Sequence, residues 1–124
     1  MSLALDLFLL RGLRRELAAW LARTRVIGEA REEIILATHE AAANAIEHAR
    51  SGSEVTVRGV RDASKVVVVV TNSGRWKEPR PFDEKRGRGL TLMRRLMSDL
   101  EIQVRSQRTT VRMRKDLSAF PVGA

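Results

Sequence analysis

The sequence predicts a two-layer α+β sandwich, in which helices cover one face of a mixed, mainly antiparallel β-sheet. Three observations lead to this fold class. Two long segments near the N-terminus have helical periodicity, two pairs of short β-branched segments follow, and a third helical segment lies between those pairs. With 124 residues, 44% of them hydrophobic, the chain is long enough for one domain with its own core.

Two helices are expected in the first part of the chain. Residues 5–21 have leucines three and four positions apart with arginines between them, which is typical of an amphipathic helix that ends before Gly28. Residues 29–48 begin with glutamates, whose charges complement the helix dipole. Their expected apolar face consists of Ile34, Ile35, Ala41, Ala45 and Ile46.

Two strands follow a turn at residues 51–53. Alternating valines mark the first strand at 55–60, and residues 62–64 form the expected hairpin loop. The second strand, 66–70, is an unbroken run of valines, so we expect it to be buried on both faces in the centre of the sheet.

The last part of the chain begins with a polar loop. Residues 75–89 contain glycine and proline and are too many for a simple connection. A third helix is expected over residues 90–100, and a closing pair of strands over 101–105 and 109–114.

Bulk composition narrows the classes of function. The net charge of +8 favours an acidic protein surface or a triphosphate as partner. The few aromatic residues supply no base-stacking platform, so direct nucleic-acid binding is not expected. The absence of cysteine excludes disulfides and thiolate metal sites. We expect a cytoplasmic protein without a membrane partner, with one domain over residues 1–117 and a flexible tail over 118–124.

The strongest chemical pattern lies in the second expected helix. Glu40, Asn44 and His48 are four residues apart and share one helix face, beside alanines that leave room for a ligand. The Asn44 oxygen suits Mg²⁺, which takes one or two protein oxygens and the rest from phosphate and water. Glu40 can accept a proton from an attacking hydroxyl. The alternative is an alanine-rich helix with a polar surface stripe, with His48 as a hydrogen-bonded residue at its end.

Two weaker patterns involve strand ends. Asn72 and Gly74 follow the valine run, where a polar side chain can read the edge of a ligand and glycine lets the backbone come close. Thr109 and Thr110 open the last strand, where their hydroxyls can reach a phosphate. Taken alone, the first pattern is a turn and the second indicates only β-propensity.

A further pattern precedes the third expected helix. Arg86, Gly87, Arg88, Gly89 and Leu90 place glycine N–H groups and cations where a helix begins, which suits an anion. The segment lacks the Gly-Lys-Ser/Thr of a P-loop and the third glycine of a dinucleotide-binding fingerprint, so by itself it is a weak signal.

In this order, the four patterns resemble the GHKL ATPase superfamily, whose ATP pocket is the Bergerat fold. Residues 40–48 resemble its N-box, 72–74 its first glycine box, 87–90 its second glycine box and 109–110 its threonine-bearing strand. The resemblance covers nearly the whole chain. The small size and the spelling Glu-Ala-x-x-Asn-Ala-x-x-His are similar to the anti-sigma-factor serine/threonine kinases of the RsbW and SpoIIAB type.

The resemblance implies ATP and Mg²⁺ as cofactors. It implies that Glu40 is the general base, that Asn44 is the magnesium ligand, and that Asn72 takes the place of an adenine-reading aspartate. Gly74 would let the adenine lie against the backbone.

The resemblance also implies a lid over the triphosphate, formed by Gly87 and Gly89 with Arg86, Arg88 and Leu90 beside them. Thr109 or Thr110 would form a hydrogen bond near the adenine or the phosphates.

Two positions depart from the family pattern. Asn72 stands where the family has aspartate, and its amide N–H₂ needs an acceptor. An unmatched buried amide costs about 1–3 kcal/mol, so we expect weak ATP binding, tightened by Asn72→Asp. Arg108 stands where relatives often have glycine before the threonine, which changes the turn.

The function implied by the resemblance is a serine/threonine kinase that phosphorylates an anti-anti-sigma partner and sequesters a sigma factor or similar regulator. Homodimers are common among such kinases. The alternatives are a binding module without chemistry and a piece of a larger signalling protein.

Overall fold

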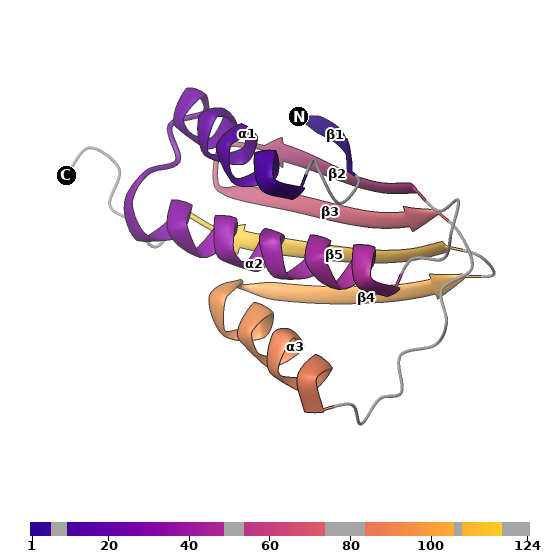
Figure 1. Ribbon diagram of the computed structural model, residues 1–124. Helices are drawn as coiled ribbons and strands as arrows, with labels where there is room; N and C mark the ends of the chain where they lie inside the picture. Colours follow the sequence, from indigo (N-terminus) through magenta and orange to yellow (C-terminus); the bar gives the residue numbers. More distant parts are fainter. Residues whose placement is uncertain (6–9, 49–53, 74–83, 106–107, 118–124) are drawn as a thin grey trace.

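The computed structural model describes residues 1–5, 10–48, 54–73, 84–105 and 108–117. Figure 1 shows one sheet with helices on one of its faces. The elements in chain order are β1 (Ser2–Leu5), α1 (Leu10–Arg23), α2 (Gly28–His48), β2 (Glu54–Arg61), β3 (Lys65–Ser73), α3 (Glu84–Leu96), β4 (Asp99–Arg105) and β5 (Arg108–Asp116).

The sheet has five strands in the order β1-β2-β3-β5-β4, and every described pairing is antiparallel. The α+β sandwich is therefore confirmed, and the described residues contain no parallel pair. The valine strand β3 lies in the centre, because it pairs with β2 on one side and β5 on the other.

The core lies between the helices and one face of the sheet. Along β3, Val66, Val68 and Val70 are buried beneath the helices, whereas Val67 and Val69 face the other side and are only half-buried. The prediction of burial on both faces is therefore wrong, since no described helix covers the second face (Figure 1). From α1, the buried side chains are Leu13, Leu17, Trp20 and Leu21.

The N-terminus forms a strand that the periodicity did not predict. The expected helix over residues 5–21 is replaced by strand β1, which pairs with residues 55–58 of β2, and by α1, which begins at Leu10. The backbone at Met1 exchanges two hydrogen bonds of 3.0 Å with Gly59. These pairings explain why the first residues are extended.

Helix α2 and the β2–β3 hairpin follow the sequence closely. α2 spans Gly28–His48, against an expected start at residue 29. In the hairpin, the Ser64 N–H donates to Asp62 Oδ1 at 2.9 Å, and this hydrogen bond lowers the pKa of the Asp62 carboxyl. The turn is therefore stabilised by a local side-chain to backbone bond, as is typical of aspartate in loops.

Helix α3 begins earlier and ends earlier than predicted. It spans Glu84–Leu96, and β4 begins at Asp99, so the expected helix over 90–100 is shifted toward the N-terminus. No described helix is long and apolar enough to span a membrane. Expected features at residues 51–53, at Gly74 and over 118–124 lie outside the described residues.

A lysine on β5 holds three elements together. Lys115 Nζ lies 3.1 Å from Glu33 Oε2 of α2 and 2.6 Å from the carbonyl oxygen of Leu96, the last residue of α3. The side chains of Lys115 and Glu33 are 13% and 25% exposed. Lys115 therefore accounts for the position of the C-terminal end of α3 beside α2.

Replacing Lys115 by methionine is expected to lower the free energy of unfolding by about 1–3 kcal/mol, because it leaves the Glu33 carboxylate poorly solvated and unpaired. Urea unfolding measures this loss. The double variant with Glu33→Gln should recover part of it. Lys65→Met is the matched control: its ion pair with Asp62 spans 3.9 Å between side chains 39% and 50% exposed, and should contribute less than about 1 kcal/mol.

Candidate functional site

Glu40 and Asn44 lie on the side of α2 that faces α3. A Cβ atom at Gly89 would be 3.1 Å from Asn44 Nδ2, 3.9 Å from Asn44 Oδ1 and 3.7 Å from Glu40 Oε2. The two polar side chains therefore meet the same point of α3, as expected for residues one helical turn apart. Both are half-buried rather than directed into open solvent.

Gly89 allows this close approach. Any larger residue at position 89 would require Asn44 to shift, because 3.1 Å is shorter than nearly all contacts of real Cβ atoms. This packing role was not predicted from the sequence, where Gly89 was interpreted only as a phosphate-binding residue. The usable signal was a glycine in one predicted helix together with small and polar residues on the face of another, because glycine lets two helices approach closely.

The two glycines lie inside a helix, and the prediction that they precede one is wrong. Gly87 and Gly89 are the fourth and sixth residues of α3 (Glu84–Leu96). The Gly89 N–H is expected to donate to the carbonyl of residue 85, four residues earlier, whereas the corresponding partner of the Gly87 N–H would be residue 83, outside the described residues. In this conformation the Gly89 N–H is therefore not free for an anion, and a phosphate contact there would require the first turns of α3 to rearrange.

Asn72 and Thr109 form the second part of the site. They are directly opposite each other in the β3–β5 pairing and are 2% and 3% exposed. Neither the Asn72 amide atoms nor the Thr109 hydroxyl has a hydrogen-bond partner among the described residues. Both residues lie on the helix-covered face, because Asn72 continues the buried series of Val66, Val68 and Val70.

The two parts lie at the same end of the molecule. Asn72 is next to the end of β3, and Thr109 is the second residue of β5. Figure 1 shows that this end of the sheet lies beneath the C-terminal half of α2, the half that carries Asn44. Residues far apart in the sequence are thus brought to one region.

Thr110 does not join this region. It is opposite Thr71, one residue after Thr109 on β5 and one residue before Asn72 on β3, and so faces the other side of the sheet. Of the two threonines, only Thr109 faces the helices. Leu90 is half-buried and packs against the core.

Several predicted site residues, or their side chains, lie outside the described part of the chain. Gly74 lies outside the described residues. Arg86 and Arg88 belong to α3, but their side chains, like that of His48 at the end of α2, also lie outside the described part.

Two apolar residues of β4 were not singled out by the sequence analysis. Ile102 and Val104 are 40% and 55% exposed, although they are opposite Val111 and Thr109 and therefore face the helix side of the sheet. They provide an apolar surface beside Thr109. The alternation of Leu100, Ile102 and Val104 was the signal that could have identified this face.

The described residues contain no preformed metal cage. No group of three or more His, Cys, Asp or Glu side chains is close enough to hold an ion there. A magnesium ion that arrives with a triphosphate needs only one or two protein oxygens, and the Asn44 amide can supply one.

The chain matches the family model of the histidine kinase-like ATPase domain over residues 3–115. The chain belongs to this family. This histidine kinase-like ATPase domain has the GHKL-type fold, and its family membership implies that it binds ATP. A search of curated proteins found no match.

Two solved structures are similar to this ATPase domain. The histidine kinase domain of the Erythrobacter litoralis EL346 blue-light activated histidine kinase has a TM-score of 0.62 and 21% identity, with 88% of this chain and 61% of that chain covered. The catalytic domain of histidine kinase ThkA has a TM-score of 0.59 and 17% identity, with 94% and 96% covered. The chain thus spans less than two thirds of the Erythrobacter chain.

The residues of the ATPase domain suit both the base and the phosphate end of an ATP molecule. Asn72 and Thr109 present buried polar atoms without partners, which a nucleobase would satisfy. Glu40 and Asn44 present a carboxylate and an amide side by side, which suits the metal and phosphate end.

Proposed function

We propose that this ATPase domain is a magnesium-dependent serine/threonine protein kinase of the anti-sigma type. Its substrate would be a hydroxyl of an anti-anti-sigma partner, and it would sequester a sigma factor or similar regulator when that partner is absent. The observation that carries the proposal is the pairing of Glu40 with Asn44, one turn apart and both against Gly89.

Each of the two side chains has a defined task in this proposal. Glu40 takes the proton of the attacking hydroxyl, the γ-phosphoryl group passes to that oxygen, and ADP leaves. Asn44 holds the magnesium ion that neutralises the triphosphate charge. Most of the rate enhancement then comes from positioning and electrostatics, which is the usual case for phosphoryl transfer.

The similar solved structures support transfer of phosphate from ATP, because both are parts of histidine kinases. Serine or threonine as acceptor is supported by the resemblance of the Glu40–Asn44 segment to anti-sigma kinases. A histidine acceptor is the rival outcome.

Surface charge supports an acidic protein partner. Arg11, Arg14 and Arg15 are exposed in the first two turns of α1, which has no acidic residue in its first turn. Cations at a helix N-terminus do not help the helix, so their presence suits attraction of an acidic surface. The proposal also includes that the domain forms a homodimer.

Phosphate transfer tests the proposal directly. The domain is incubated with Mg-ATP and a candidate anti-anti-sigma partner, and mass spectrometry identifies the modified residue. Glu40→Gln is expected to slow transfer by about 10²–10⁴-fold while ATP affinity stays within about threefold, because the base is lost and the binding groups remain. Glu47→Gln, an exposed change on the same helix, is the control.

Modification of histidine, or no transfer to any partner by a domain that binds ATP, would contradict the kinase proposal. The second result would favour a binding module that responds to nucleotide without chemistry. The specific observation for that second function is the position of Gly89 inside α3, where the helix uses its N–H group.

A further inference from the structure

The base-binding end of the site contains a carboxamide in a buried position. Asn72 is 2% exposed and lies in the central strand, between Val55 of β2 and Thr109 of β5. Its side-chain oxygen and nitrogen both lack a partner among the described residues. Buried polar atoms without partners are rare in native folds, and those at a ligand site are explained by the ligand.

Thr109 adds a hydroxyl to the same place. It is directly opposite Asn72, is 3% exposed, and its Oγ1 also has no partner in the described part of the chain. The pair therefore presents one acceptor oxygen, one amide with two donors, and one hydroxyl that can donate or accept. A planar ligand edge with adjacent donor and acceptor groups matches this set.

A carboxamide is compatible with both kinds of purine edge. The 6-aminopurine of adenine has an N6–H₂ donor beside the N1 acceptor, whereas a 6-oxopurine has an O6 acceptor beside an N1–H donor. Turned one way, an asparagine amide accepts from N6–H₂ and donates to N1. Turned by 180° about its last bond, it donates to O6 and accepts from N1–H.

A carboxylate at this position would behave differently. When one of its oxygens lies beside the purine 6-substituent, that oxygen accepts from N6–H₂ of adenine, whereas beside O6 of a 6-oxopurine it forms a contact of two acceptors without a proton between them. Sites that leave a buried polar group unpaired reject the wrong ligand strongly. The identity of residue 72 therefore decides whether the two purine edges are distinguished.

We infer that Asn72, with Thr109, makes this site accept 6-oxopurine nucleoside triphosphates as well as ATP. The inference rests on the proposed nucleotide site and concerns the base rather than the phosphates. Asn72 is in this sense a specificity-determining residue, and Thr109 contributes to both binding modes.

Inosine triphosphate is the sharpest probe, because it has the O6 and N1–H edge but lacks the 2-amino group of guanine. Affinities for ATP and inosine triphosphate are measured by displacement of a ribose-labelled fluorescent ATP analogue in the presence of Mg²⁺. In the unmodified protein, the two dissociation constants are expected to agree within about tenfold. In Asn72→Asp, the ratio should shift toward ATP by about tenfold to a hundredfold.

Two threonine variants provide a matched pair for the second residue. Thr109→Val is expected to weaken both nucleotides by a similar factor, whereas Thr110→Val, on the other face of the sheet, should leave both unchanged. Thermal unfolding checks that each variant is folded. If Asn72→Asp does not fold, the ratio of the dissociation constants for ATP and inosine triphosphate in the unmodified protein still tests the inference.

The outcomes separate the two proposals. Binding of ATP with inosine triphosphate more than about a hundredfold weaker would overturn the inference and leave the nucleotide site intact. No binding of any nucleoside triphosphate at millimolar concentration would overturn both. Similar affinities for the two nucleotides, with a shift in Asn72→Asp, support the inference.

Discussion

Replacing Asn44 by alanine is expected to remove the magnesium-dependent part of ATP binding, with a loss of about tenfold to a hundredfold in affinity when Mg²⁺ is present. The reason is that a magnesium ion needs an oxygen ligand on the protein, and the Asn44 amide is the one beside Glu40 and Gly89. Without Mg²⁺, the variant and the unmodified protein should bind ATP equally. Titration with a fluorescent ATP analogue, with Mg²⁺ and with a chelator, measures both.

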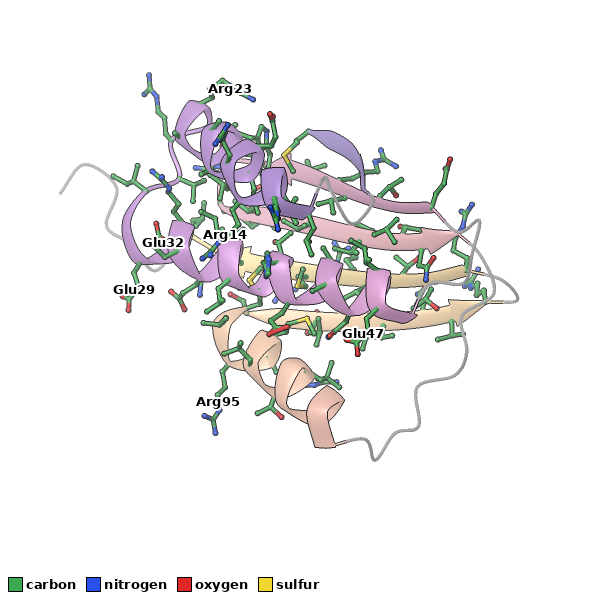
Figure 2. All side chains as sticks on the ribbon, in the orientation of Figure 1. Arg14, Arg23, Glu29, Glu32, Glu47 and Arg95 are labelled. Atoms are coloured by element: carbon green, nitrogen blue, oxygen red, sulfur yellow. The ribbon has the colours of Figure 1, made fainter. Side chains whose placement is uncertain are left out.

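We expect Asn44→Ala to fold normally, so that the loss of ATP affinity does not reflect unfolding. Asn44 is half-buried, and the smaller alanine leaves more room beside Gly89 rather than creating a clash. Figure 2 shows Glu47 near the C-terminal end of the same helix, and Glu47→Gln is the control for a polar change there. Equal losses with and without Mg²⁺ would show that Asn44 acts on packing or on the base and not on the metal.

The second large effect is expected at Gly59, where substitution should destabilise the fold. A Cβ atom at this position would be 2.8 Å from Cη2 and Cζ3 of Trp20. Valine favours strands more than glycine, by up to about 1 kcal/mol. The clash outweighs this gain, because Trp20 is 8% exposed and packed among the core leucines of α1 and cannot retreat. We expect Gly59→Val to cost about 3 kcal/mol.

Urea unfolding of three variants tests the Gly59 contact. Gly12→Ala, in α1, is the matched control: a Cβ there meets nothing within 4 Å, so this change should stabilise the protein by about 0.5–1 kcal/mol. The double variant Gly59→Val with Trp20→Leu should lose less than the sum of the single changes. A neutral Gly59→Val would mean that the indole does not pack on β2.

Helix α2 and its polar face were predictable from the sequence because both depend on residues close together in the chain. Glu40 and Asn44 share a face wherever the segment is helical, and α2 has nearly the expected bounds. The central position of the valine strand was predictable for a similar reason, since continuous β-branched residues favour a strand with neighbours on both sides. The roles given to these site residues stay predictions.

Periodicity did not predict the strand at the start of the chain or the residue at which α3 begins. Leucines at residues 3 and 5 suit either a helix or a strand, and pairing with β2 decides between them. Glycines and arginines before residue 90 suggested a loop, but α3 begins at Glu84. In both places tertiary contacts override weak local preferences.

By itself, the sequence determined the GHKL superfamily, the fold class and the order of the chemical patterns along the chain. Only the tertiary structure decided which faces meet: that Gly89 packs against Asn44 and Glu40, that Thr109 rather than Thr110 shares the buried face with Asn72, and that no described helix covers the second face of the sheet. The physical reason is that periodicity defines the faces of one element. Which faces come together depends on strand register and helix packing between residues far apart in the chain.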